Sequence, residues 1–419
     1  MKRAVLHSDL NAFFASVETV LHPEYEGEAM AVCGSEEDRH GIVLAKSEKA
    51  KRAGVRTGMA IWEAKRACPG LLIAEPHYEA YLKFSRLVRA IYRRYSDLVE
   101  PYGLDECWID VTGSQRLFGT PEEIAHAIRK TVREELGLTV SVGVSFNKVF
   151  AKLGSDLRKP DAVSVIGEDN FREMLWPLPV GSLLYAGPAA VQRLSRMDIR
   201  TIGELAQADA SLLERLLGVG GIQLWRYANG LDTSRVMREE EVIPLQSIGH
   251  GMTCNADLET GAEVQAVMLE LSQEIGKRLE EAGLTATGIQ IEIRDRHLQS
   301  KQAMASLPFP TRSRRILAEE AFALYRRRFG TSVGEGIRSV TVRAIRLIRD
   351  SGDRQLDLFG DSEKTDRLDK LEKAMDEVTD RYGKDALLPA DVLANPKTKC
   401  NIRQISVFPR GSTGTSGRR

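Results

Sequence analysis

The sequence contains few cysteines, and none of them forms a CxxC pair. Zinc sites and disulfide frameworks normally show closely spaced or regularly paired cysteines, so we expect neither. We predict instead that the cysteines are small buried apolar residues. They are Cys33, Cys68, Cys107, Cys254 and Cys400.

Long hydrophobic runs are also absent. No stretch reaches the roughly 20 apolar residues that a membrane-spanning helix needs. Residues 1–3 lead directly into a short strand-like segment, without the pattern of a signal peptide. We therefore expect a soluble, cytoplasmic protein without a membrane partner.

The chain of 419 residues has no net charge, because 59 Lys and Arg balance 59 Asp and Glu. The total therefore does not indicate a polyanionic partner, but the distribution of charge does. Residues 285–350 contain thirteen Lys and Arg against six Asp and Glu. This excess predicts a phosphate-binding face; the alternative is a solvated face that merely carries many arginines.

A chain of this length exceeds what one compact core supports, so we expect several domains. Residues 1 to about 165 alternate short apolar strands with amphipathic helices, which predicts an α/β unit. The expected strands are residues 4–6, 31–33, 41–44, 107–111 and 139–144, and the expected helices are residues 78–95, 121–136 and 147–156.

Residues 166–233 are predicted to be mostly helical, with glycine-containing turns at residues 185–188 and 218–221. Turns between helices can present backbone N–H groups to a phosphate. Each turn alone is equally typical of an ordinary tight turn. Their tandem arrangement favours binding of a nucleic-acid backbone.

A small α+β domain is predicted after the charged, linker-like segment 235–244. Its expected strands, in which apolar residues alternate with a period of about two, are residues 288–294 and 337–343. Its expected helices are residues 261–282 and 313–329. This domain contains most of the basic excess. Further on, we expect a solvated charged helix at residues 364–382 and disorder in the last ten residues.

Three carboxylates lie beside apolar strand segments. Asp9 lies in HSDLNAFFASVE (residues 7–18), and Asp105 and Glu106 lie in GLDECWIDVTGS (residues 103–114). Burying acids is costly unless a cation compensates them. An α/β fold can bring all three to one end of neighbouring strands, where their oxygens suit Mg²⁺ ions and phosphoryl transfer. For each acid alone, the alternative is a solvated residue at a strand end.

Together with SVGVSFNKVFAKLGSDLRKP (residues 141–160), these motifs resemble the Y-family translesion DNA polymerases, in particular the DNA polymerase IV (DinB-type) branch. The resemblance covers residues 1–348, and three long motifs in the right order are far more specific than one. It implies a bacterial, monomeric DNA-directed DNA polymerase of low fidelity that acts in DNA repair. Such an enzyme transfers a nucleotide from a dNTP to the primer 3′-hydroxyl of primer-template DNA, using two Mg²⁺ ions that Mn²⁺ can replace.

The resemblance also implies a right-hand architecture of α/β and α+β domains. Its parts are a palm at residues 1–11 and 75–165, fingers at 12–74, a helical thumb at 166–233, a linker at 234–244, a little finger at 245–348 and a tail at 349–419.

The metal site implied by the resemblance consists of Asp9, Asp105, Glu106 and the backbone carbonyl of Leu10. The family commonly has a second aspartate where this chain has Asn11. Because the metal ligands are assigned to Asp9 and the Leu10 carbonyl, we expect this departure to be tolerated.

The resemblance also implies the nucleotide contacts. Phe14 matches the steric gate, an apolar ring that leaves no room for a ribose 2′-hydroxyl. Phe13 is expected to pack against the sugar and the fingers, and Lys159 matches a lysine that contacts the triphosphate. The family usually has a tyrosine and, three residues later, a cation at the triphosphate; here these residues are Glu48 and Lys51. We expect Glu48 to reduce nucleotide affinity without abolishing activity.

The tail contains QLDLF at residues 355–359, which resembles the bacterial sliding-clamp-binding pentapeptide. The residues expected to contact the clamp are Gln355, Leu356, Leu358 and Phe359.

Two other functions are compatible with parts of the sequence. A catalytically weak relative that serves as a clamp- or partner-binding scaffold would be expected to lack the metal carboxylates, which are present. Another palm-like two-metal enzyme, such as a nucleotide cyclase, would explain neither the tandem turns nor QLDLF.

Overall fold

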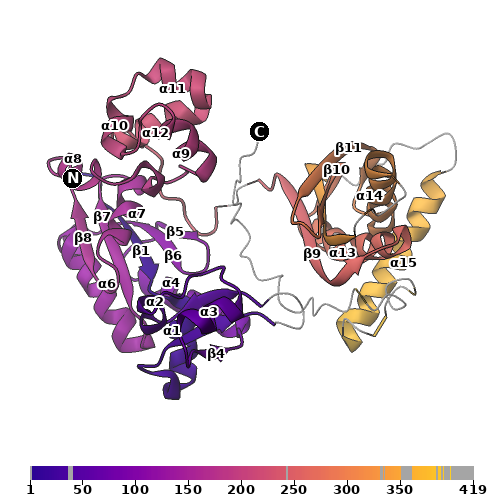
Figure 1. The fold of residues 1–419 in the computed structure, drawn as a ribbon, viewed down its shortest axis with the longest axis horizontal. Helices are drawn as coiled ribbons and strands as arrows, with labels where there is room; N and C mark the ends of the chain where they lie inside the picture. The colour runs from indigo at the N-terminus through magenta and orange to yellow at the C-terminus, as the bar shows by residue number, and fades with distance from the viewer. Residues whose placement is uncertain are drawn as a thin grey trace. The chain divides into compact units, whose positions relative to one another are not determined.

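The computed structural model describes most of the chain and divides into two compact units (Figure 1). The first unit comprises residues 2–34 and 42–241, and the second comprises Ser35, Gly41 and the described residues from 244 onward. The described residues are 2–35, 41–241, 244–330, 334, 336–350, 361–383, 386, 387, 390 and 397. QLDLF, Cys400 and the last ten residues lie outside them.

A five-stranded sheet in the order β5-β6-β1-β7-β8 forms the centre of the first unit. β1 is antiparallel to both of its neighbours, β6 and β7, and β7 is parallel to β8. All six residues of β1 are buried, as is typical of a central strand covered on both faces. The strands are β1 (Val5–Leu10), β5 (Val99–Tyr102), β6 (Glu106–Asp110), β7 (Val140–Ser145) and β8 (Val163–Ile166).

Helices cover both faces of this sheet. α4 (Tyr78–Tyr92) and α6 (Pro121–Leu136) share a hydrophobic core with one face. α7 (Lys148–Leu157) packs on the other face. Its close approach requires Gly143 on β7, because a Cβ atom there would collide with the carbonyl oxygen of Ala151.

A three-stranded sheet in the order β3-β2-β4 lies with short helices in the same unit. The elements are α1 (Phe13–Leu21), η1 (Pro23–Tyr25), β2 (Met30–Cys33), β3 (Val43–Lys46), α2 (Glu48–Arg52), α3 (Ile61–Ala67) and β4 (Leu72–Ala74), and α5 (Gln115–Phe118) follows β6. The predicted strands correspond to β2 and β3, whereas β4 was not predicted.

Residues 166–233 are mostly helical, as predicted. It contains α8 (Phe171–Leu175), η2 (Val180–Ser182), α9 (Pro188–Ser195), α10 (Ile202–Gln207), α11 (Ala210–Leu217) and α12 (Val219–Ala228). The first predicted turn lies between η2 and α9, which Gly187 precedes. Of the second, only Gly218, with a φ of 66°, separates α11 from α12, because residues 219–221 already belong to α12.

The first part of the linker-like segment packs against the first unit. Val236 is buried with Val5 and Trp108 in one apolar cluster. The backbone N–H of Met237 donates to Oε2 of Glu100 over 2.9 Å. These contacts fix a segment whose composition alone indicated a free linker.

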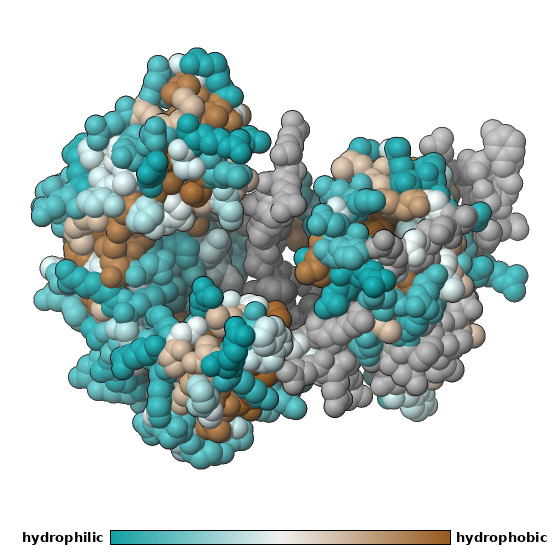
Figure 2. All heavy atoms as spheres, in the orientation of Figure 1, coloured by the Kyte–Doolittle hydropathy of each residue, from teal (hydrophilic) through white to brown (hydrophobic). Residues whose placement is uncertain are grey.

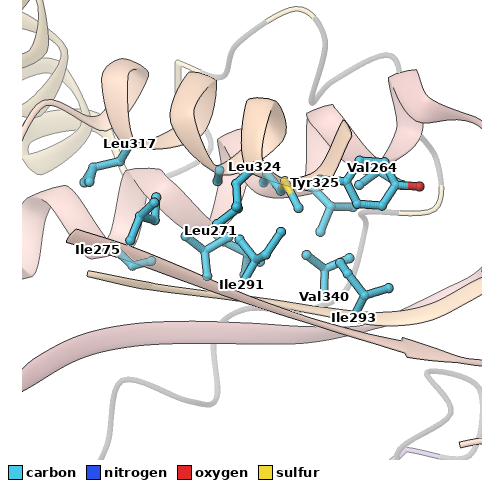
Figure 3. Close-up of a cluster of buried hydrophobic side chains, with 14 of the residues drawn as sticks. Val264, Leu271, Ile275, Ile291, Ile293, Leu317, Leu324, Tyr325 and Val340 are labelled. Atoms are coloured by element: carbon cyan, nitrogen blue, oxygen red, sulfur yellow. The ribbon is translucent and has the colours of Figure 1, made fainter. Parts of the chain in front are cut away.

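The second unit is an antiparallel sheet in the order β11-β10-β12-β9, with two helices packed on it. Apolar side chains from α13, α14, β10 and β12 meet in its core (Figure 3). The elements are β9 (Ser247–Leu258), α13 (Gly261–Glu281), β10 (Leu284–Asp295), β11 (Ser300–Thr311), α14 (Arg314–Phe329) and β12 (Ile337–Arg349). The α+β prediction is confirmed, but β9 and β11 were missed.

The charged helix α15 (Asp361–Tyr382) is not solvated on all sides, so this expectation was wrong. Asp376 forms an ion pair with Arg314, at the start of α14. Ser313 donates to Oε1 of Glu372 over 2.8 Å. Polar contacts of this kind leave no apolar stripe in the sequence, which explains the error.

The described surface agrees with the absence of long apolar runs. In the part of the chain that the structure describes, no helix has the length and apolar character to cross a membrane. The visible face is largely hydrophilic, with scattered hydrophobic patches (Figure 2). The four described cysteines are buried, as predicted.

Candidate active site

The carboxylates predicted to bind metal come together at one end of the central sheet. Asp9, near the end of β1, lies opposite Glu106, the first residue of β6. The backbone N–H of Leu10 donates to the carbonyl oxygen of Asp105 over 3.0 Å. Antiparallel pairing therefore joins two sequence motifs that lie almost 100 residues apart.

Two lysines contact these carboxylates. Nζ of Lys159 lies 2.6 Å from Oδ2 of Asp9 and 2.7 Å from Oδ1 of Asp156. Lys152, on α7, forms a short ion pair with Glu106. Lys159 was predicted as a nucleotide contact, but Lys152 was missed. The signal that could have identified Lys152 was its position on α7, the helix that covers this face of the sheet.

His7 is a further residue that the sequence motifs did not single out. Its ring is buried on the same face of β1 as Asp9, because side chains two residues apart share a face. Nε2 lies 3.3 Å from Oε2 of Glu106, without the alignment of a hydrogen bond. Nδ1 is within 2.9 Å of the Ser155 hydroxyl. Burial lowers the pKa of His7 to about 4, so the ring is neutral at pH 7.

Burial also determines the charges of the three carboxylates. It raises the pKa of Asp9 to about 7, although Lys159 opposes this effect. Burial and the nearby charge of Glu106 raise the pKa of Asp105 to about 6. Burial acts on Glu106 as well, but contacts with His7 and Lys152 outweigh it and lower the pKa to about 2. The raised pKa values of Asp9 and Asp105 mean that their ionised forms are disfavoured, and a bound cation would stabilise these forms.

The donors at this end of the sheet fit a divalent metal ion in type. Carboxylate and carbonyl oxygens are the ligands that Mg²⁺ prefers. Within the described residues, however, no three His, Cys, Asp or Glu side chains already converge on one metal position. Asp9 and Glu106 are instead each paired with a lysine amine.

The predicted gate residue Phe14 stands at the start of α1, half-buried, with aromatic support. Its ring stacks on Tyr81 at a centroid distance of 4.2 Å and an interplanar angle of 9°. Tyr78 makes an edge contact at 6.0 Å, and Phe13 lies 5.5 Å away. Both tyrosines come from α4, so sequence order gave no indication of this stack.

Glu48 and Lys51 lie on α2, where they contact each other. Nζ of Lys51 lies 3.3 Å from Oε1 of Glu48; the Lys51 side chain is exposed and that of Glu48 is partly exposed. Ser47 caps the helix by accepting a hydrogen bond from the N–H of Ala50. The Glu48 carboxylate therefore partly neutralises the cation that the sequence predicts at the triphosphate.

Comparison with known proteins identifies the family. The model of the impB/mucB/samB family matches residues 8–156, and the model of its C-terminal domain matches residues 245–358. DNA polymerase IV of Acetivibrio thermocellus is 45% identical over 383 residues, which cover 91% of this chain and 96% of that protein. DNA polymerase IV 2 of Bacillus subtilis is 34% identical, covering 93% of this chain and 94% of that protein.

A solved structure shares the fold. A Y-family DNA polymerase chimera of Dbh and Dpo4 superimposes with a TM-score of 0.72 at 23% identity, over 83% of this chain and 99% of that one. At this identity the likeness shows the fold alone, and the family follows from the sequence relatives. The resemblance predicted from the motifs is confirmed: the chain belongs to the impB/mucB/samB family, in the DNA polymerase IV branch of the Y-family translesion DNA polymerases.

Proposed function

We propose that this polymerase extends a DNA primer by two-metal nucleotidyl transfer from a dNTP, with Mg²⁺ as the ion. Asp9, Asp105, Glu106 and the Leu10 carbonyl would hold the metal. The observation that supports this most strongly is the pairing of Asp9 opposite Glu106, which places a buried and a partly buried carboxylate on adjacent strands. Bound Mg²⁺ would activate the primer 3′-hydroxyl and offset the charge on the phosphates.

The residues around the carboxylates have separate tasks in this proposal. Lys159 and Lys51 bind the triphosphate by charge–charge attraction. Phe14 lies beneath the incoming sugar and excludes ribonucleotides, because a 2′-hydroxyl would clash with its ring and lose its hydrogen bonds. Phe13, which is buried beside Phe14, supports this wall of the pocket.

The rest of the chain is proposed to hold the DNA. The sheet with its helices is the palm, residues 12–74 are the fingers, and α8–α12 form the thumb, whose turns at Gly187 and Gly218 would meet the phosphate backbone. The second unit is the little finger. Buried and accessible residues alternate along β12, and Arg343 and Arg346 are exposed, which suits contact with phosphates irrespective of sequence.

We also propose that QLDLF binds a sliding clamp. The pentapeptide follows β12, which ends at Arg349, and precedes α15, which begins at Asp361. A peptide of this kind would tether the polymerase to DNA without a new contact in the active site.

Primer extension with Mg²⁺ tests the polymerase activity and its site together. The intact chain should extend a primed template, and the Asp105→Ala/Glu106→Ala variant should not. The absence of nucleotide addition by the intact chain would contradict the proposed function. Addition at an unchanged rate by the double variant would contradict only the assignment of the metal ligands.

A further inference from the structure

A fully buried carboxylate lies one helical turn beyond the proposed steric gate. Glu18 and Phe14 are four residues apart on α1, and the Glu18 side chain is completely inaccessible to solvent. Burying a carboxylate is costly unless hydrogen bonds or a charge compensate it. Glu18 is the last residue of the HSDLNAFFASVE motif that contains Asp9, but the mechanism above gives it no task.

The partners of Glu18 come from the start of α4. The Tyr81 hydroxyl makes a short hydrogen bond to Oε1 of Glu18. Nδ1 of His77 lies 2.9 Å from Oε2, and the backbone N–H of His77 donates to Oε1 over 3.3 Å. Glu18 therefore binds the first turn of α4 to α1.

Tyr81 connects this carboxylate to the gate. Its side chain is fully buried, and burial, together with the hydrogen bond to Glu18, holds the pKa of its hydroxyl well above the usual range. The hydroxyl thus keeps its proton and donates a hydrogen bond to Glu18. The ring of Tyr81 stacks face to face on Phe14.

Contacts among these three side chains connect two helices. Phe14 and Glu18 both project from α1, and Tyr81 reaches from α4, which contacts α1 (Figure 1). One end of Tyr81 is fixed by a hydrogen bond to Glu18, and its face limits the rotation of Phe14. A gate excludes a 2′-hydroxyl only while its ring cannot move away, because a rotamer change would relieve the clash.

We propose that Glu18 is a positioning residue for ribonucleotide exclusion: it fixes Tyr81, and Tyr81 holds the Phe14 ring in the position that rejects the 2′-hydroxyl. The proposal rests on the proposed role of Phe14 as the steric gate. Glu18 itself touches neither nucleotide nor metal. A purely structural role, as a cap for α4, would instead lower all activities together.

Single-nucleotide incorporation separates these two roles. The variants are Glu18→Gln and Tyr81→Phe, and kcat/KM is measured for a dNTP and for the matching rNTP opposite the same template base. Each variant should lower the dNTP-to-rNTP selectivity by about tenfold, as expected for the loss of one positioned contact. The change should come from a higher kcat/KM for the rNTP, with the value for the dNTP almost unaltered.

Tyr95→Phe is the matched control. Tyr95 follows the end of α4, and its hydroxyl lies 3.3 Å from that of Thr131, so the same atom is removed far from the gate. This control should keep the selectivity of the intact chain. The Glu18→Gln/Tyr81→Phe double variant should be no worse than either single one, because both act through one contact.

The outcomes distinguish this inference from the proposed gate. Phe14→Ala should admit ribonucleotides; if it does not, the gate assignment fails and the role of Glu18 fails with it. If Phe14→Ala admits them but folded Glu18→Gln and Tyr81→Phe keep full selectivity, only the role of Glu18 is overturned. Equal losses for dNTP and rNTP would also overturn it, in favour of a structural cap. Tyr81→Phe keeps the ring, so it serves as the deciding variant if Glu18→Gln does not fold.

Discussion

The amine of Lys159 lies between two carboxylates, 2.6 Å from Asp9 and 2.7 Å from Asp156. This lysine thus connects a proposed metal ligand on β1 with the end of α7. Although burial opposes it, the attraction of Asp9 and Asp156 raises the pKa of Lys159, so the amine stays charged. This charged amine is proposed to bind the triphosphate, and it also stabilises the ionised form of Asp9.

Replacing Lys159 by methionine tests the first of these tasks. Lys159→Met keeps most of the side-chain volume and removes the charge, so the KM for dNTP should rise by about tenfold, as for other charged hydrogen bonds. Steady-state single-nucleotide incorporation measures this. Lys130→Met on α6 is a suitable control, because Lys130 is exposed and pairs only loosely with Glu134 at 3.8 Å. An equal KM in both variants would contradict the assignment of Lys159.

The Glu48 carboxylate should weaken nucleotide binding. It occupies the first turn of α2, where the helix terminus favours anions, and it contacts Lys51 at 3.3 Å. Glu48→Tyr removes this competing negative charge, so the KM for dNTP should fall by a few fold. Glu28→Gln provides the control, since Glu28 pairs with Lys49, on the same helix, at 3.1 Å. An unchanged KM in Glu48→Tyr would refute the expected repulsion.

Sequence patterns predicted those elements whose signals are local. The helix α6 was predicted with both ends correct, because Thr120 and Glu123 form a capping box and Gly137 ends the helix with a φ of 68°. The helices α13 and α14 were also predicted to within a few residues. The α/β alternation of the first unit was predicted as well, but its strands β4, β5 and β8 were not. The sheet around Asp9 followed from apolar runs interrupted by acids.

Features that depend on contacts between distant segments were missed. β11 has few buried residues and therefore no clear apolar alternation. The stack of Tyr81 on Phe14 and the pairing of Lys152 with Glu106 join residues far apart in the sequence. Only the packing of α4 and α7 on the sheet brings these partners together.

The QLDLF segment should bind a bacterial sliding clamp. Leu358→Ala/Phe359→Ala removes the two apolar side chains expected to fill its pockets, so binding of the full chain to the purified clamp should be lost in surface plasmon resonance. Leu371→Ala, which removes a leucine that is 53% exposed on α15, should leave binding unchanged. Primer extension without the clamp should be the same for all three proteins. Retained binding by the double variant would contradict this assignment.

Glu270, on α13, should make the stability of the protein depend on pH. Burial raises its pKa to about 7 from a usual value of 4.5, and its Oε2 has no hydrogen-bond partner within the described residues. The folded state therefore binds this proton more tightly than the unfolded state. The stabilising contribution is complete below pH 4.5 and is lost as pH rises towards 7, where a buried charge must form.

Glu270→Gln removes this titration and keeps the shape of the side chain. The free energy of unfolding of the variant minus that of the intact chain should be larger at pH 8 than at pH 5. The increase should be on the order of 1 kcal/mol for a partly accessible group. Urea unfolding followed by circular dichroism at the two pH values measures this gain. Glu281→Gln, at the exposed end of α13, should show no such difference between the two pH values. An identical effect of Glu270→Gln at pH 5 and pH 8 would mean that Glu270 is ionised in the folded protein throughout this range, with a partner that compensates its charge.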